Sequence, residues 1–292
     1  LITLTTTSKR KLNMALSIQS NMASMSIQNQ LGRSNNDLST ALERLGSGFK
    51  INSAKDDAAG LQIASRLNAQ VRGQEAALYN SNNAMSMMQT AEGAFDEMTN
   101  IAYRMKELAT QGSSDTNGAK EWTAQSTEYM ALSAELANIM TNTSFGDGTN
   151  LLSATGKFGA GAVNFQVGAS AAETLNVDIS TQLTAVTTAQ GTAAAFTDVA
   201  TAQAEITKVN TIIDNIGAAR SSLGASMNRL DHTMTNVTNM KQNTQAAVGT
   251  LMDADFAAET SNMTKQQLLM NSGISVLSTA NSTTQMIGSL LR

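Results

Sequence analysis

The chain has 292 residues, enough for one or two domains with a buried core. It contains no proline, and aromatic residues make up only 4% of it, so helices can run without interruption around a core of aliphatic side chains. The net charge of −4 and the lack of a basic stripe argue against nucleic acid as a partner. The absence of cysteine excludes disulfides and thiolate metal sites.

The start of the chain differs in character from the rest of it. Residues 1–13 lack the apolar stretch and the small-residue cleavage site of a Sec-type signal peptide. A new pattern begins at Met14, which we interpret as the true start, with residues 1–13 as a non-native upstream segment; a disordered basic tail is the alternative. No apolar run reaches the 18 residues of a membrane span, so no membrane insertion is expected.

Amphipathic helices are expected near both ends, over about 15–45 and 253–292. Gly46, Ser47 and Gly48 predict the end of the first. Each helix carries one apolar stripe at helical spacing, which we take as a candidate assembly interface. The stripe residues are Ile18, Met22, Met25, Leu31, Leu38 and Leu42 in the first helix, and Met263, Met270, Ile274, Leu277, Ile287 and Leu291 in the second.

A sustained coiled-coil pattern begins the middle of the chain. Over 58–110, apolar residues recur at intervals of three, four and seven, which predicts one long helix. A turn at 112–118 and a shorter amphipathic helix over 120–140 come next. The short connection makes this helix an antiparallel neighbour of the long one.

The periodicity then changes to two, which predicts a β-hairpin at about 155–180. Residues 181–198 are rich in threonine and alanine and are interpreted as a short variable connection. A second long helix is expected over 199–251. Arg220 occupies a skipped position of its seam, either as a buried polar residue that fixes register or as a side chain that extends from the edge to solvent.

Charge separates the ends from the middle, because residues 14–32 and 266–291 contain no charged residue. A lone helix of this kind is marginal in water, and each stripe residue gains about 1.5–3 kcal/mol only when fully buried. We therefore expect the ends to become ordered among copies of the chain. The expected domains are 14–57 with 252–292 for assembly, and 58–251 as a helical rod.

The expected fold class is mainly α, a long antiparallel coiled-coil bundle formed by the N- and C-terminal halves, with a small β-hairpin. Three features that suggest chemistry have simpler explanations. Gly46–Lys50 lack the spacing of a phosphate loop, Asp56 and Asp57 suit a helix N-terminus better than a metal, and His232 has no catalytic partner.

Several motifs resemble those of bacterial flagellin and occur in that family's order. The N-terminal ones are LERLGSGFKINSAKDDAAG at 42–60 and QTAEGA at 89–94. Others are TSFGDG at 143–148 with Leu151 and Leu152, FQVG at 165–168, LGA at 223–225, NRL at 228–230, ETSNM at 259–263 and SLLR at 289–292. The resemblance extends from Met14 to Arg292, with only 181–198 at the place of the family's variable outer domains, which indicates a short form.

The resemblance implies an extracellular structural subunit that polymerises with itself into the flagellar filament and is exported unfolded by the flagellar type III apparatus. It implies no enzymatic activity and no cofactor. Implied partners are an export chaperone, the export apparatus, and hook-associated and cap proteins. A hook–filament junction protein of the same superfamily is the alternative function.

The resemblance also points to an innate immune receptor of vertebrates, Toll-like receptor 5, as a further partner. Arg104, Leu108 and Glu128 fall on the family's contact positions, although Tyr103 and Lys106 depart from its motif. A secreted receptor ligand or adhesin is therefore an added role to consider. The simpler interpretation is that Leu108 packs in the seam and that Arg104 and Glu128 form a solvated pair.

Overall fold

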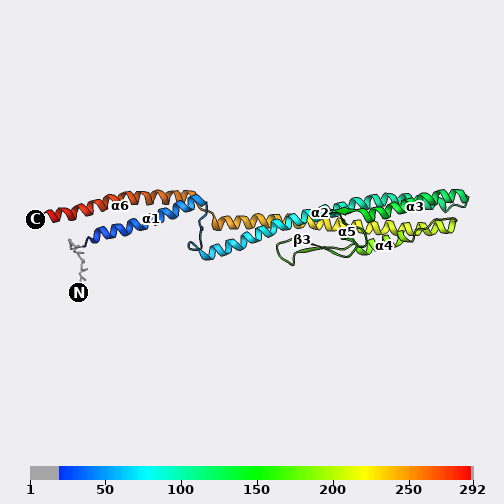
Figure 1. Ribbon diagram of the computed structural model, residues 1–292, viewed down its shortest axis with the longest axis horizontal. Helices are drawn as coiled ribbons and strands as arrows, with labels where there is room; N and C mark the ends of the chain where they lie inside the picture. The colour runs from blue at the N-terminus through cyan, green and yellow to red at the C-terminus, as the bar shows by residue number, and fades with distance from the viewer. Residues whose placement is uncertain (1–19, 291–292) are drawn as a thin grey trace, which may run out of the picture. The chain divides into compact units, whose positions relative to one another are not determined.

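The computed structural model describes residues 20–290, which form six α-helices and two short antiparallel hairpins. All five predicted helices are present among them (Figure 1). Four of the five lie within a few residues of their expected bounds. In chain order the elements are α1 (Met22–Ser47), α2 (Ala58–Gly112), α3 (Ala119–Asn142), β1 (Ser144–Phe145), β2 (Thr149–Asn150), β3 (Val163–Gln166), β4 (Thr174–Val177), α4 (Ser180–Gly191), α5 (Val199–Met252) and α6 (Phe256–Leu290).

The chain divides into two compact units, each built from segments distant in sequence. Unit 1 combines Leu1–Ser65 with Ala247–Arg292, and unit 2 is Arg66–Ala246. Helices α2 and α5 contribute residues to both units.

Unit 1 is built around an antiparallel pair of helices, α1 and α6 (Figure 1). Arg44, late in α1, forms an ion pair with Glu259, early in α6, at 3.0 Å. At the other end the Asn21 side chain donates to the Ala280 carbonyl at 3.2 Å. Beyond the αL cap at Gly48, the Ala254 N–H donates to the Gly48 carbonyl at 2.9 Å, which ties the bases of the two helices together.

The less exposed residues of α1 and α6 recur at intervals of three and four, and several of them are small. Ser24, Ser34 and Ala41 are buried on α1. At Gly273 on α6, an added Cβ would lie 2.7 Å from the Leu31 Cδ2 atom, so the Leu31 side chain fills the space left by the glycine. Close approach of the two backbones therefore depends on small residues in the seam.

Unit 2 contains the hydrophobic core, assembled from α2, α3, α4, α5 and both hairpins. The predicted seam of α2 supplies much of it, since Phe95, Met98 and Met105 have no exposed surface. Ion pairs Glu92–Arg220 and Glu75–Lys241 link α2 to α5 in an antiparallel sense. The predicted fold class, a mainly α antiparallel bundle with a small hairpin, is confirmed.

The predicted hairpin is confirmed as β3 and β4, with Phe165 opposite Leu175. The connection at 181–198, by contrast, contains the helix α4, which the composition did not predict. Leu183, Val186 and Ala189 lie buried on one face of it, and its threonine hydroxyls return to carbonyls four residues earlier. Burial of that face against the core stabilises a helix that propensity alone would not favour.

Candidate assembly interface

Several predicted stripe residues of unit 1 are exposed. Met22 is 68% exposed and Met25 54%, both on the first turn of α1, and Leu42 near its end is 49% exposed. On α6, Ile274 is 56% exposed. These side chains are the part of the predicted stripes that no element of the described chain covers.

The remaining stripe residues divide into two groups. Five are half-buried and belong to the seam between α1 and α6: Leu31, Leu38, Met263, Met270 and Leu277. Ile18 and Leu291 lie outside the described residues, and the side chain of Ile287 is not described. The predicted stripes thus combine residues that hold the helix pair together with residues that remain available to another molecule.

Sequence reasoning missed part of the exposed apolar surface of α6. Leu268 is 64% exposed, and Phe256, Leu269, Val276 and Met286 are also exposed. The signal for this was the run Leu268, Leu269 and Met270, because three consecutive helical residues cannot all face one partner. Two of them must point away from the seam.

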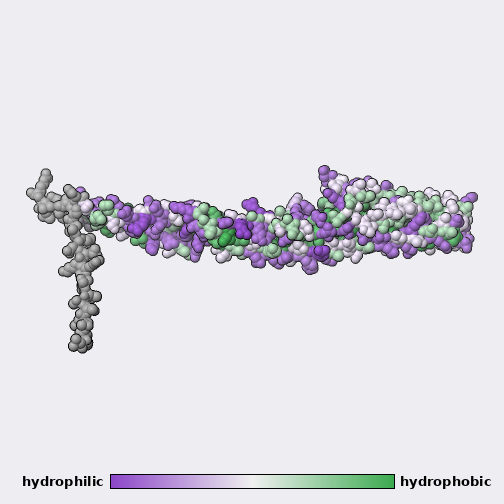
Figure 2. All heavy atoms as spheres, turned by 90° about the horizontal axis from the view of Figure 1, so that it is seen from below, coloured by the Kyte–Doolittle hydropathy of each residue, from purple (hydrophilic) through white to green (hydrophobic). Residues whose placement is uncertain are grey.

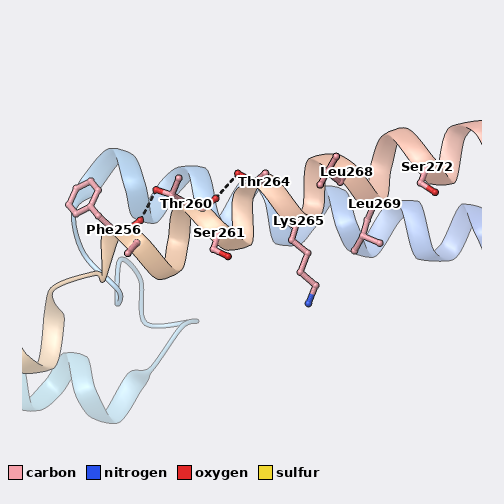
Figure 3. A pocket seen from close by; sticks show the side chains of 9 residues that line it. Phe256, Thr260, Ser261, Thr264, Lys265, Leu268, Leu269 and Ser272 are labelled. Carbon is pink, nitrogen blue, oxygen red and sulfur yellow. Dashed lines mark hydrogen bonds between the residues drawn. The ribbon is translucent and has the colours of Figure 1, made fainter.

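Some of these residues line a shallow groove on the exposed side of α6, shown in Figure 3. Phe256, Leu268 and Leu269 form its apolar walls, and small residues such as Ser261 and Ser272 lie between them. Lys265 is the one charged residue in its lining. Apolar residues also reach the surface in several other places on the face seen in Figure 2. The groove is therefore an apolar surface with a single cation.

The seam of unit 1 also contains an ion pair. Glu259 is only 8% exposed, and its Oε1 atom accepts from Arg44 Nη1 at 3.0 Å. Nearby, Gln266 Nε2 donates to Asp37 Oδ2 at 3.5 Å. These residues line a polar pocket of about 320 Å³. A charge as buried as Glu259 requires such a partner, so the ion pair belongs to the helix pair itself.

The residues implied as receptor contacts lie on unit 2, and they differ in exposure. Arg104 and Glu128 are exposed, with Arg104 Nη2 2.8 Å from Glu128 Oε1. The hydrogen bonds of Arg104 to Glu107 and then to Glu128 raise the pKa of its guanidinium. Leu108 is 2% exposed and belongs to the core. A receptor contact at these positions stays a prediction.

The other residues singled out from sequence have structural roles. Gly48 is the αL cap of α1, Asp56 accepts from the N–H groups of Asn52 and Ser53, and Asp57 accepts from the N–H of Gly60. Arg220 extends from the edge of the seam to Glu92 and Asp96.

The single histidine of the chain, His232, is exposed. Within residues 20–290, no group of three or more histidine, cysteine or acidic residues is placed to hold a metal. No helix of the described part is both long and apolar enough to cross a bilayer.

Two family models cover most of the chain. Residues 18–157 match the bacterial flagellin N-terminal helical region, and residues 206–291 match the bacterial flagellin C-terminal helical region. The chain belongs to the bacterial flagellin family. The segment between the two matches, residues 158–205, holds β3, β4, α4 and the start of α5.

Relatives in the flagellin family align over nearly their whole length. A flagellin of Halalkalibacterium halodurans is 37% identical over 276 residues, covering 94% of this chain and 99% of the relative. A flagellin of Listeria monocytogenes is 34% identical over 286 residues, with coverage of 94% and 99%. A solved Vibrio parahaemolyticus structure, described as a putative flagellar hook-associated protein, shares the fold at a TM-score of 0.54 and 14% identity, covering 68% of this chain and 99% of that chain.

Proposed function

We propose that this chain is a structural subunit that polymerises with copies of itself into the filament of the bacterial flagellum, outside the cell. The observation that carries the proposal is the apolar surface left uncovered on α1 and α6, in a chain that belongs to the flagellin family at both ends. An exposed apolar surface of this kind is typical of a site that contacts another molecule.

The chemistry of this surface favours a second copy as the cover. Each exposed leucine, isoleucine or methionine gains about 1.5–3 kcal/mol on full burial. The surrounding polar residues of α6 are serine, threonine, asparagine and glutamine, which are uncharged and can be buried with hydrogen bonds. A polymer repeats the same contact at every subunit, so a modest gain per residue is sufficient for a stable assembly.

The proposal includes no catalytic activity. The groove on α6 brings together apolar walls and one lysine, without an acid–base pair or a nucleophile oriented by a base. Family membership further supports unfolded export by the flagellar type III apparatus with a chaperone, and contact with hook-associated and cap proteins at the ends of the filament. These partners are part of the proposal.

Seeded polymerisation of the purified chain tests this function. We expect electron microscopy to show long tubes growing from short filament fragments, with growth above a critical concentration. A hook–filament junction protein, the alternative in the same superfamily, would cap the fragments without elongating them. Failure to elongate any seed, under conditions in which a related flagellin does so, would reject the filament function.

A further inference from the structure

The charges of α6 are few, and one of them has no ion-pair partner in the described part of the chain. Between Phe256 and Leu290, α6 has only two charged residues, Glu259 and Lys265. Glu259 is paired with Arg44 of α1. Lys265 forms no ion pair within the described part of the chain, and its ammonium extends away from the other labelled side chains in Figure 3.

This lone cation lies in the apolar groove that the proposed function covers with a second copy, so its need for a partner rests on that function. Covering Phe256, Leu268 and Leu269 would remove water from around Lys265 as well. A buried charge without a partner is strongly unfavourable. The surface that enters the groove must therefore carry apolar side chains together with a carboxylate.

Helix α1 has such a combination on its exposed side. Leu42 is exposed beside Glu43, whose Oε1 atom accepts from Asn52 Nδ2 at 2.7 Å. The second carboxylate oxygen of Glu43 has no hydrogen-bond partner among residues 20–290. Asp37, the other acid of α1 outside an ion pair, faces Gln266 of its own α6. Glu43 is thus the acid of α1 that combines an exposed apolar neighbour with a free oxygen.

We propose that in the polymer α1 of one copy packs into the α6 groove of the next, with Glu43 opposite Lys265. The apolar contact supplies the attraction, and the ion pair selects the partner helix and its position along the groove. Because the groove has no second cation, Glu43 can form an ion pair at only one position along it.

Charge reversal of each partner tests this pairing in the full-length chain. We expect Lys265→Glu and Glu43→Lys each to raise the critical concentration for seeded polymerisation about tenfold or more, because like charges then face each other. An equimolar mixture of the two variants should polymerise at a critical concentration near that of the wild type. In the mixture, the groove of each variant can bind an α1 of opposite charge from the other variant. If Glu43 and Lys265 met within one chain, mixing the two variants would not restore polymerisation.

Matched variants separate this pairing from a general effect of charge. Arg33→Glu and Asp37→Lys also reverse charges on α1. In a mixture with Asp37→Lys, which keeps both Glu43 and Lys265, the Lys265→Glu chains should remain in the soluble fraction, whereas Lys265→Arg should polymerise by itself. Circular dichroism of each dilute variant should match the wild type.

Two results would overturn the pairing while leaving the filament function intact. The first is Lys265→Glu polymerising at the wild-type critical concentration, as expected for a groove that stays open to solvent. The second is a mixture of Lys265→Glu and Glu43→Lys that stays monomeric. Failure of the wild type itself to polymerise would instead reject the proposed function on which the pairing rests.

Discussion

At the scale of single residues, Tyr129 forms a buried polar contact in unit 2. Its hydroxyl donates to Glu205 Oε2 at 2.8 Å, and Lys208 Nζ lies 2.7 Å from the Oε1 atom of the same carboxylate. Burial, followed by the hydrogen bond to Glu205, raises the pKa of Tyr129 far above its ordinary value. The raised pKa favours the protonated phenol, which is the form that donates to Glu205.

Removing this donor should destabilise unit 2. Tyr129→Phe leaves an oxygen of the buried Glu205 without its partner, and we expect the free energy of unfolding to fall by about 1–3 kcal/mol. Urea denaturation followed by circular dichroism measures it. The matched control is Tyr79→Phe, at an exposed tyrosine, which should change the free energy by less than about 0.5 kcal/mol. Equal effects of the two substitutions would contradict a special role for Tyr129.

The pKa of Asp56 determines how the stability of the loop between α1 and α2 depends on acid pH. Backbone hydrogen bonds from Ser53 and Asn52 lower the pKa of Asp56 below its ordinary value of 3.8. Its stabilising contribution is therefore complete above pH 3.8 and is lost as the pH falls through the lowered pKa of the folded state.

We expect Asp56→Asn to remove this acid sensitivity. The difference in melting temperature between the wild type and the variant should be constant above about pH 5 and should shrink as the pH falls below about 4. Differential scanning calorimetry from about pH 2.5 to about pH 7 measures it, under conditions that keep the chain monomeric. A difference that grows with falling pH would contradict the sign of this argument.

At the scale of elements, the helix pair of unit 1 depends on the fit of Leu31 against Gly273. Gly273→Leu would place a bulky side chain where Leu31 lies, and we expect the pairing of α1 with α6 to weaken by about 1–3 kcal/mol. Hydrogen exchange of α6 amides in the dilute monomer measures it. Gly32→Leu is the control, because nothing lies within 4 Å of a Cβ at that position. Faster exchange in the control as well would count against the fit.

The sequence was most informative about long helices and least informative about which face of a helix meets which partner. Periodicity predicted α2 and α5, since a seam sustained over many turns has no other explanation. Periodicity could not show that Leu31 lies in the seam of α1 whereas Met25 is exposed. The seam also contains Ser24, Ser34 and Ala41, which carry little or no apolar signal in the sequence. Only the structure shows that these small residues are buried in the seam.

Other elements were missed for related physical reasons. Helix α4 gains its stability by burying Leu183 and Val186 against the core, a tertiary effect that its threonine-rich composition conceals. The hairpin of β1 and β2 has two residues in each strand, too few for alternation to be recognised. Lys265 could not be recognised from the sequence, because a single lysine matches no motif. Only the structure places it in one groove with Phe256, Leu268 and Leu269.

At the scale of the whole molecule, the two units have different tasks. Unit 2 buries its own core, with Phe95, Tyr129 and Leu136 fully enclosed. Unit 1 leaves Met22, Leu268 and Ile274 exposed on helices that carry little charge. We therefore expect unit 2 to be stable in a single chain and unit 1 to be completed by its neighbours in the polymer.

Seeded polymerisation of a chain without residues 266–292 tests this division most directly. Electron microscopy should show no tubes at concentrations at which the full-length chain elongates every seed, because the truncation removes Leu268, Leu269 and Ile274 together. The same sample should retain the cooperative thermal transition of unit 2. Growth of tubes at the full-length critical concentration would contradict the claim that the exposed face of α6 drives assembly.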